Sequence, residues 1–233
     1  MAREITFFGH SAFRVTSDAD LSIWIDPWLG NPSAPDAPPP EPPDLVLITH
    51  AHGDHLGDCA ALCRSSDTEV VAIHEVQQYL LGKGLPNVTG MNIGGTYTTK
   101  GVTLTMVPAL HSSSIQEDDR IICGGAAAGF VIRLEGGTAL YHAGDTALFG
   151  DMALIGELYR PEVAMIPIGS HYVMGPKEAA HACRLIRPRT AIPMHFGTFP
   201  VLTGTVAAFD AALREIAPNV RMTALAPGET LSF

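Results

Sequence analysis

The stretch Leu45–Asp58, LVLITHAHGDHLGD, decides how the rest of the sequence is interpreted. It opens on a short apolar run that predicts a buried strand. Three histidines and an aspartate follow within six positions, namely His50, His52, Asp54 and His55. Imidazole and carboxylate groups in a short loop after a strand can converge on one point, and they are donors that zinc, manganese and iron accept. A chance group of surface histidines explains this density poorly.

Three further ligand-type residues follow apolar runs in the same way: His111 in VPALHSSS, Asp145 in YHAGDT and His195 in AIPMHFGTFP. A lone histidine at the end of a strand is usually a hydrogen-bonded core or rim residue. These three residues, however, share the context of the first cluster. Together the five histidines and two aspartates can hold two divalent ions with positions left for water. The sequence therefore predicts a metal site.

Length and composition narrow the class of protein. A chain of 233 residues suits one domain, 1–233, and the excess of 24 acidic over 14 basic residues disfavours nucleic acid as a partner. The N-terminus, MAREITFFGH, lacks the apolar core of a signal peptide, and no apolar run is long enough to span a bilayer. The four cysteines do not form the pattern of a secreted disulfide framework. We expect a cytoplasmic protein that acts on a small molecule without a membrane partner, and a homo-oligomer is compatible with this composition.

Apolar periodicity and turn residues predict similar elements in both halves of the chain. Strands are expected at 4–8, 12–15, 21–25, 45–48, 70–73, 103–107, 129–134, 138–142, 163–167 and 190–194. Helices are expected at 58–64, 75–81, 151–159, 177–186 and 205–217. Strands followed by helices in each half predict two sheets packed face to face with helices outside.

Segments along nearly the whole chain resemble the metallo-β-lactamase superfamily, and within it the branch of the UPF0173 metal-dependent hydrolases and ascorbate-phosphate lactonase. The segments are GHSAF, IDP, THAHGDHLGD, MNIGGT, VPALHSSS, AAGFVI, YHAGDTALFGDM, PIGSHYVMGPKEAA and PMHFGTFP. This resemblance implies an α/β fold, the four-layer αββα sandwich, which agrees with the strand and helix pattern.

The resemblance also implies a role for each ligand-type residue. Two triads would hold two divalent metal ions, with zinc preferred and manganese or iron as alternatives. The first triad is His50, His52 and His111, and the second is Asp54, His55 and His195. Asp145 would bridge the two ions, and Asp26 would hold the THAHGDH loop through hydrogen bonds.

The implied reaction is hydrolysis of a small-molecule ester, lactone or phosphodiester. Two shared cations lower the pKa of water from 15.7 to about 7, which would provide a metal-bridged hydroxide as the nucleophile. Asp54 is the first catalytic candidate, because it lies beside the bridging position and can orient the nucleophile and handle its proton. His171, in PIGSHYVMG, is the second, as a hydrogen-bond donor to substrate; an ordinary loop histidine is an equally good interpretation.

Three other features of the sequence lead to expectations about local structure. His10 is expected to be hydrogen-bonded at a turn, with a pocket role as the alternative. The proline-rich loop 27–43 is expected to emerge beside the site, and Trp28 is expected either to pack against the sandwich edge or to contact substrate. Cys59 and Cys63 lie four apart on one helix face, which favours apolar packing over a disulfide.

Two other functions remain as alternatives. An iron-dependent oxidoreductase resembling the sulfur dioxygenases would use the same fold. Flavin-linked di-iron members resemble the pattern HxExDH, with glutamate where this chain has His52, and this difference favours hydrolysis. A catalytically silent metal-binding protein of the same fold would usually have lost ligands, whereas all seven ligand-type residues are present in this chain.

Overall fold

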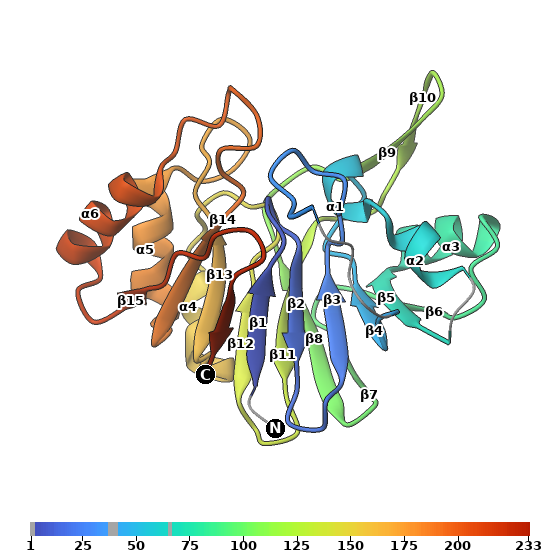
Figure 1. The fold of residues 1–233 in the computed structure, drawn as a ribbon, viewed down its shortest axis with the longest axis horizontal. Helices are drawn as coiled ribbons and strands as arrows, with labels where there is room; N and C mark the ends of the chain where they lie inside the picture. Colours follow the sequence, from blue (N-terminus) through green and yellow to red (C-terminus); the bar gives the residue numbers. More distant parts are fainter. Residues whose placement is uncertain (1–2, 37–41, 65–66) are drawn as a thin grey trace.

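The computed structural model describes residues 3–36, 42–64 and 67–233. Two seven-stranded sheets pack face to face, and helices lie on the outside of the sandwich (Figure 1). The predicted four-layer αββα architecture is confirmed. Residues 37–41 of the proline-rich loop lie outside the described residues.

The order of the strands across each sheet differs from their order in the sequence. From edge to edge, the first sheet consists of β16 (Thr230–Ser232), β1 (Glu4–Phe7), β2 (Phe13–Thr16), β3 (Ser22–Ile25), β4 (Leu45–Leu47), β5 (Glu69–Ile73) and β6 (Val88–Met91). The second sheet consists of β15 (Arg221–Met222), β14 (Thr190–Met194), β13 (Val163–Pro167), β12 (Ala139–His142), β11 (Ala128–Arg133), β8 (Val102–Pro108) and β7 (Thr96–Thr99). A separate hairpin is formed by β9 (Ser114–Glu117) and β10 (Arg120–Cys123).

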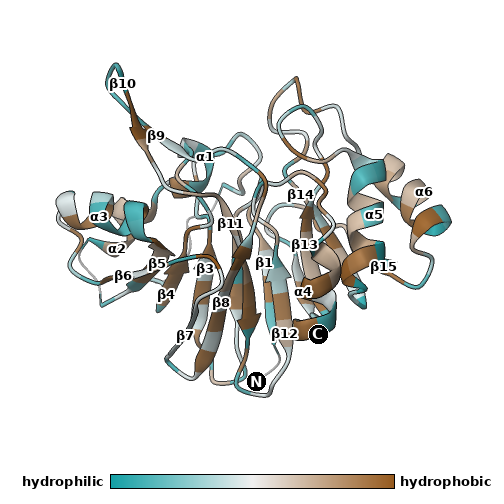
Figure 2. Ribbon diagram, turned by 180° about the vertical axis from the view of Figure 1, so that it is seen from behind, coloured by the Kyte–Doolittle hydropathy of each residue, from teal (hydrophilic) through white to brown (hydrophobic). Residues whose placement is uncertain are grey.

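The helices follow strands in both halves of the chain. They are α1 (Gly53–Leu56), α2 (Cys59–Cys63), α3 (His74–Gly82), α4 (Met152–Tyr159), α5 (Pro176–Ile186) and α6 (Val206–Ile216). Helices α5 and α6 show both hydrophobic and hydrophilic segments, whereas strands of the sandwich are largely hydrophobic (Figure 2). The buried core includes Trp24, Phe13 and Phe130, all at most 1% exposed. Burial of this apolar surface is the main favourable term in folding.

The direction of the strands brings their connecting loops to one edge. Strands β3, β4 and β5 are parallel, as are β12, β13 and β14. Strand β8 is antiparallel to β11, which is antiparallel to β12, so β8 and β12 run the same way. The residues that follow these strands in the sequence therefore gather on one rim of each sheet.

The predicted elements agree with the structure, but seven elements were not predicted. These are α1, β6, β7, β9, β10, β15 and β16. Helix α1 has only four residues and β15 only two, so neither is long enough to show a periodic pattern of apolar residues. Strand β7 alternates only between exposed and half-buried positions and so lacks the apolar face of a core strand. No helix in the described part of the chain is long and apolar enough to cross a membrane.

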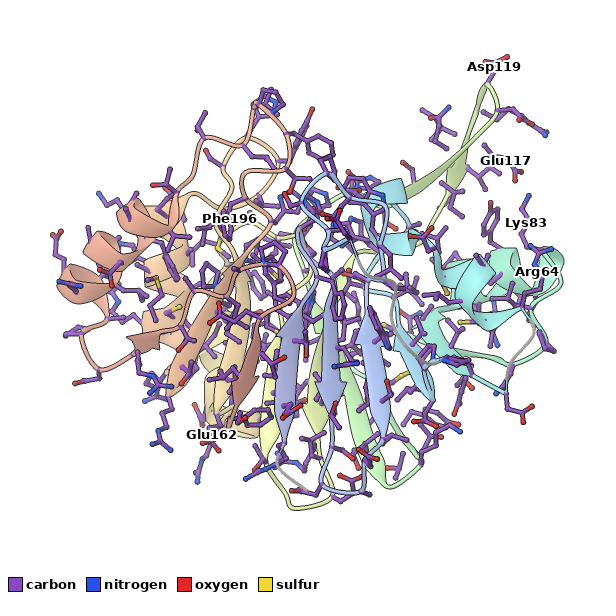
Figure 3. All side chains as sticks on the ribbon, viewed as in Figure 1. Arg64, Lys83, Glu117, Asp119, Glu162 and Phe196 are labelled. Carbon is purple, nitrogen blue, oxygen red and sulfur yellow. The ribbon has the colours of Figure 1, made fainter. Side chains whose placement is uncertain are left out.

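The β9–β10 hairpin projects from the sandwich beside α1 (Figure 1). Glu117, on β9, forms an ion pair with Lys83 after α3, and Figure 3 shows both side chains near the hairpin. The Tyr79 hydroxyl also donates to Glu117 Oε1, at 3.2 Å. These contacts connect the hairpin to α3.

Glu69 links the two sheets near one side of the sandwich. It is only 6% exposed and accepts hydrogen bonds from Thr89 on β6 (2.8 Å) and from Tyr97 (2.8 Å) and Thr99 (2.6 Å) on β7. Burial alone would raise the pKa of Glu69, but the hydrogen bonds from Thr99, Thr89 and Tyr97 outweigh it and leave the pKa below its ordinary value.

We expect Glu69→Ala to lower the free energy of unfolding by about 2–3 kcal/mol at pH 7, because it leaves three hydroxyls without their acceptor. A carboxylate whose folded pKa is depressed stabilises the fold above its unfolded pKa, about 4.3, and this contribution is lost as the pH falls through the folded pKa. The difference between wild type and variant should therefore shrink below about pH 4.3. Urea unfolding from pH 7 to 3 measures it, with the exposed Glu215→Ala on α6 as control. A gap that is independent of pH would contradict the assigned charge.

Candidate metal centre

The seven predicted ligands meet on the rim formed by the strand ends. His50 and His52 follow β4, and Asp54 and His55 lie in α1 directly after them. From the second sheet, His111 follows β8, Asp145 follows β12 and His195 follows β14. The rim thus joins the two halves of the sandwich, and every one of the seven residues belongs to a group of side chains able to hold a metal ion.

The first group consists of His50, His52 and His111. Their ligand atoms lie within 4.8 Å of one another, with His50 Nε2 3.1 Å from His52 Nδ1. His50 is fully buried, whereas His52 and His111 are half-buried. This group is therefore closed on the side of the core and open toward solvent.

The second group contains Asp54, His55 and His195. Asp54 Oδ2 lies 3.9 Å from the Nε2 atoms of both histidines. His55 and His195 are buried, while the side chain of Asp54 keeps 23% exposure. Asp54 therefore stands at the open side of the group, where a reacting molecule can approach.

Asp145 lies between the two groups. Its Oδ2 is 2.9 Å from His195 Nε2 and 3.6 Å from His111 Nε2, and its Oδ1 is 3.3 Å from His55 Nε2. One carboxylate thus contacts histidines of both groups. This is a position from which a carboxylate could bridge two ions, and the bridging role that the resemblance implies for Asp145 stays a prediction.

Asp26 holds the THAHGDH loop through hydrogen bonds, as predicted. It is fully buried, and it accepts hydrogen bonds from the Thr49 amide (2.8 Å) and the Thr49 hydroxyl (2.7 Å). Its Oδ2 also lies 2.7 Å from His55 Nδ1. In the neutral ring, a proton on Nδ1 leaves Nε2 of His55 with a free lone pair facing Asp145, which is the form that binds a metal.

The electrostatics of the site follow from burial and from the two aspartates. Burial lowers the pKa of His50 far below its ordinary value, so its imidazole is neutral at neutral pH. Burial alone would raise the pKa of Asp145, but the neighbouring His55 and His195 hold it well below the usual range. Burial would likewise lower the pKa of His55, yet Asp145 and Asp26 raise it. In the absence of metal, the rim therefore combines an ionised Asp145 with a neutral His50 and with a His55 whose protonated form the two aspartates favour.

The donor set fits divalent metal ions. His55 Nε2 and Asp145 Oδ1 are buried and, although 3.3 Å apart, neither has a hydrogen-bond partner of acceptable geometry in the described part of the chain. Leaving such atoms unpaired costs free energy, whereas an ion between them would satisfy both. Nitrogen and oxygen donors of this kind suit zinc, manganese and iron.

His10 is the member of the site that sequence reasoning assigned a mainly structural role. It lies in the β1–β2 turn, and its Nε2 is 3.0 Å from Asp54 Oδ2. Its ligand atoms fall within the same 4.8 Å group as Asp54, His55 and His195. The motif GHSAF was the available signal, but it did not indicate the contact with a residue 44 positions away.

The rings of Trp28 and Phe199 lie beside His10. Trp28 is half-buried and meets the His10 ring edge-on, with centroids 5.2 Å apart, and it stacks on Phe199 at 5.8 Å. The start of the proline-rich loop thus emerges beside the site, as expected. Both packing and contact with substrate are compatible with this position, so the role of Trp28 in substrate binding stays a prediction.

His171 lies apart from the ligand groups. It is exposed in the loop after β13, with φ of +60°, and its ring contacts Tyr172 at 4.5 Å. It is in none of the groups able to hold a metal. Its predicted contact with substrate therefore requires that substrate enter the recess lined by residues of the His171 loop.

The sandwich with histidines and aspartates on one rim defines the metallo-β-lactamase class of fold. A family model described as the beta-lactamase superfamily domain matches residues 4–195. The chain is 50% identical to a UPF0173 metal-dependent hydrolase of Methanopyrus kandleri, covering 97% of this chain and 98% of that protein. It is 44% identical to another of Koribacter versatilis, covering 98% and 97%.

A solved structure supports the same assignment. It is Igni18, a metallo hydrolase from the archaeon Ignicoccus hospitalis, with a TM-score of 0.88, 38% identity, and coverage of 100% of this chain and 99% of that chain. The chain belongs to the β-lactamase superfamily and, within it, to the family of UPF0173 metal-dependent hydrolases.

Proposed function

We propose that the protein uses two divalent metal ions, zinc in the first place, to hydrolyse a small-molecule ester, lactone or phosphodiester. The observation that carries this proposal is the position of Asp145 between two groups of ligand atoms. When bound by these residues, a pair of ions would supply a hydroxide nucleophile at neutral pH and would polarise the oxygen of the bond to be cleaved.

The residues of this chain contribute orientation and proton handling. Asp54 combines partial exposure with contacts to the second group, so its carboxylate can accept a proton from the nucleophile and pass it to the leaving group. Burial would raise the pKa of Asp54, but the hydrogen bond from His10 and the proximity of His55 keep it below its ordinary value. Asp54 is therefore ionised and able to accept at neutral pH.

A recess of about 380 Å³ beside the metal centre is our candidate substrate pocket. Its lining includes Leu110, which precedes His111, and Ala147, two positions after Asp145. The Ala147 amide donates to Leu110 O (3.1 Å), and the Met174 amide donates to Thr146 O (3.2 Å). The loop 169–175 is thereby fastened to the chain segments that carry two of the ligands.

We propose that His171 contacts substrate from this recess. Ser170 and His171 are consecutive residues with left-handed φ of +66° and +60°, a costly backbone conformation that often occurs at functional sites. Both line the recess together with the exposed Tyr172. A donor at this position would bind the part of the substrate that extends away from the cleaved bond.

The charge of the recess favours uncharged substrates. None of the described residues that line it is lysine or arginine, and Glu178 is its carboxylate. Recognition of a phosphate group commonly uses arginine or lysine. We therefore place carboxylic esters and lactones before phosphodiesters.

The test is a substrate panel run on protein freed of metal by a chelator and then reloaded with zinc, manganese or iron. Matched lactones, carboxylic esters and phosphodiesters should show hydrolysis that depends on the ion, with the carboxylic substrates turned over faster. Oxygen uptake is followed in parallel. Oxygen consumption on the iron form without hydrolysis of any substrate would reject the proposal in favour of redox chemistry.

A further inference from the structure

We propose that His10 is a positioning residue of the metal centre: its Nε2–H donates to Asp54 Oδ2, and the Thr198 hydroxyl donates to its Nδ1, so that Asp54 is held toward the second metal ion. The inference rests on the two-ion part of the proposed function. It adds a residue pair, His10 and Thr198, that acts on one ion through Asp54.

The His10 ring has one polar partner at each nitrogen. Nε2 lies 3.0 Å from Asp54 Oδ2, and Nδ1 lies 2.9 Å from Thr198 Oγ1. A carboxylate accepts hydrogen bonds but cannot donate them when ionised, so Nε2 must carry the proton. A neutral imidazole then has an acceptor at Nδ1, and the Thr198 hydroxyl is the donor that satisfies it. The other acceptor near this hydroxyl, Phe196 O, is more distant at 3.4 Å.

His10 contacts the Asp54 oxygen that faces the second group. Asp54 Oδ2 accepts from His10 Nε2 at 3.0 Å and lies 3.9 Å from the Nε2 atoms of both His55 and His195. Asp54 belongs to the four-residue helix α1, whose preceding residue makes no side-chain cap. A short helix at a solvent-facing rim leaves the carboxylate rotamer poorly determined. The bond from a buried ring would fix this rotamer and hold Oδ2, which has a second lone pair, toward the second group.

The backbone of His10 supports a role beyond that of a turn residue. Its φ is +54°, a left-handed conformation that few non-glycine residues adopt and that often occurs at functional sites. The turn is locked on both sides: the His195 amide donates to His10 O at 2.7 Å, and the preceding Gly9 faces Asn31, where a Cβ would come within 2.6 Å of Asn31 Oδ1. The fold thus holds His10, 1% exposed, in an uncommon backbone conformation with its ring directed at Asp54.

The experiment measures zinc binding rather than turnover. His10→Asn is the main variant, because asparagine tolerates a left-handed φ but is too short to reach Asp54. In calorimetric titrations of the metal-free protein, we expect the first zinc to bind as in wild type and the second to bind 10- to 100-fold more weakly. Thr198→Val should weaken the second zinc in the same direction by a smaller factor, whereas Thr198→Ser, which keeps the hydroxyl, should behave as wild type.

A spectroscopic measurement decides between a positioning role and direct ligation. Nitrogen-15 NMR of the zinc-loaded wild-type protein should show a proton on Nε2 of His10 and none on Nδ1. Zinc bound to Nε2 would overturn the proposal, as would unchanged binding of both ions by His10→Asn. Should His10→Asn fail to fold, the Thr198 pair and the NMR spectrum still decide. A wild-type protein that binds one zinc would contradict the proposed two-ion function, while the tautomer of His10 would still test the contact with Asp54.

Discussion

Replacing Asp145 with alanine is expected to reduce hydrolysis by on the order of a thousandfold or more, about 4 kcal/mol in the barrier. The carboxylate contacts histidines of both ligand groups, through Oδ2 to His111 and His195 and through Oδ1 to His55. No other carboxylate in the described chain lies between both groups. Its loss would therefore separate the two ions and remove the shared nucleophile, not merely weaken one site.

The measurement combines kcat/KM on the best substrate of the panel with metal content by mass spectrometry. The variant should retain less than one ion per chain after dialysis against a weak chelator. Asp145→Asn is the matched variant, because it keeps the size of the side chain and loses only the charge. Circular dichroism identifies any loss of fold. Activity within tenfold of wild type, with both ions retained, would show that Asp145 does not bridge.

The convergence of the seven ligand-type residues was predictable because each occupies a position that sequence patterns mark. His111, Asp145 and His195 follow apolar runs, and His50 to His55 form a dense cluster after another run. A strand end is a local feature, and parallel strands bring their ends to the same edge. Local periodicity and one rule of topology were therefore sufficient to place these side chains on one rim.

The role of His10 was not predictable in this way, because its partners are remote. Asp54 lies 44 positions away and Thr198 lies 188 positions away. A histidine in a turn gives no sign of which residues its own sheet and the opposite sheet bring to it. The same limit applies to Glu69, whose acceptor role depends on hydroxyls of β6 and β7, and β7 was itself not predicted. Contacts between elements that are distant in sequence are decided by strand pairing within each sheet and by the packing of the two sheets.

Asp26→Asn is expected to leave the fold intact and yet remove most of the second metal ion, with kcat/KM reduced by on the order of a hundredfold or more. Asparagine has the shape of aspartate and tolerates the left-handed φ of +48° at this position. Its carbonyl can still accept from the Thr49 amide. Its NH₂ group, however, would stand where Oδ2 now faces His55 Nδ1 at 2.7 Å.

This change reverses the hydrogen bond to His55. An amide NH₂ can only donate, so Nδ1 of His55 would become an acceptor and the ring proton would move to Nε2. A protonated Nε2 cannot bind a metal, although it would still lie near Asp145. His50, His52 and His111 do not depend on this bond, so the first ion should remain.

Metal content and thermal melting together separate this effect from simple destabilisation. We expect about one zinc per chain and a free energy of unfolding of the metal-free variant lower by about 1–3 kcal/mol, since the Thr49 hydroxyl also loses its carboxylate acceptor. Asp26→Ala, which removes every acceptor from this fully buried site, should be more destabilised than Asp26→Asn. An Asp26→Asn protein that keeps both ions would show that His55 binds metal independently of its tautomer partner. The second site would then owe its geometry to the loop alone.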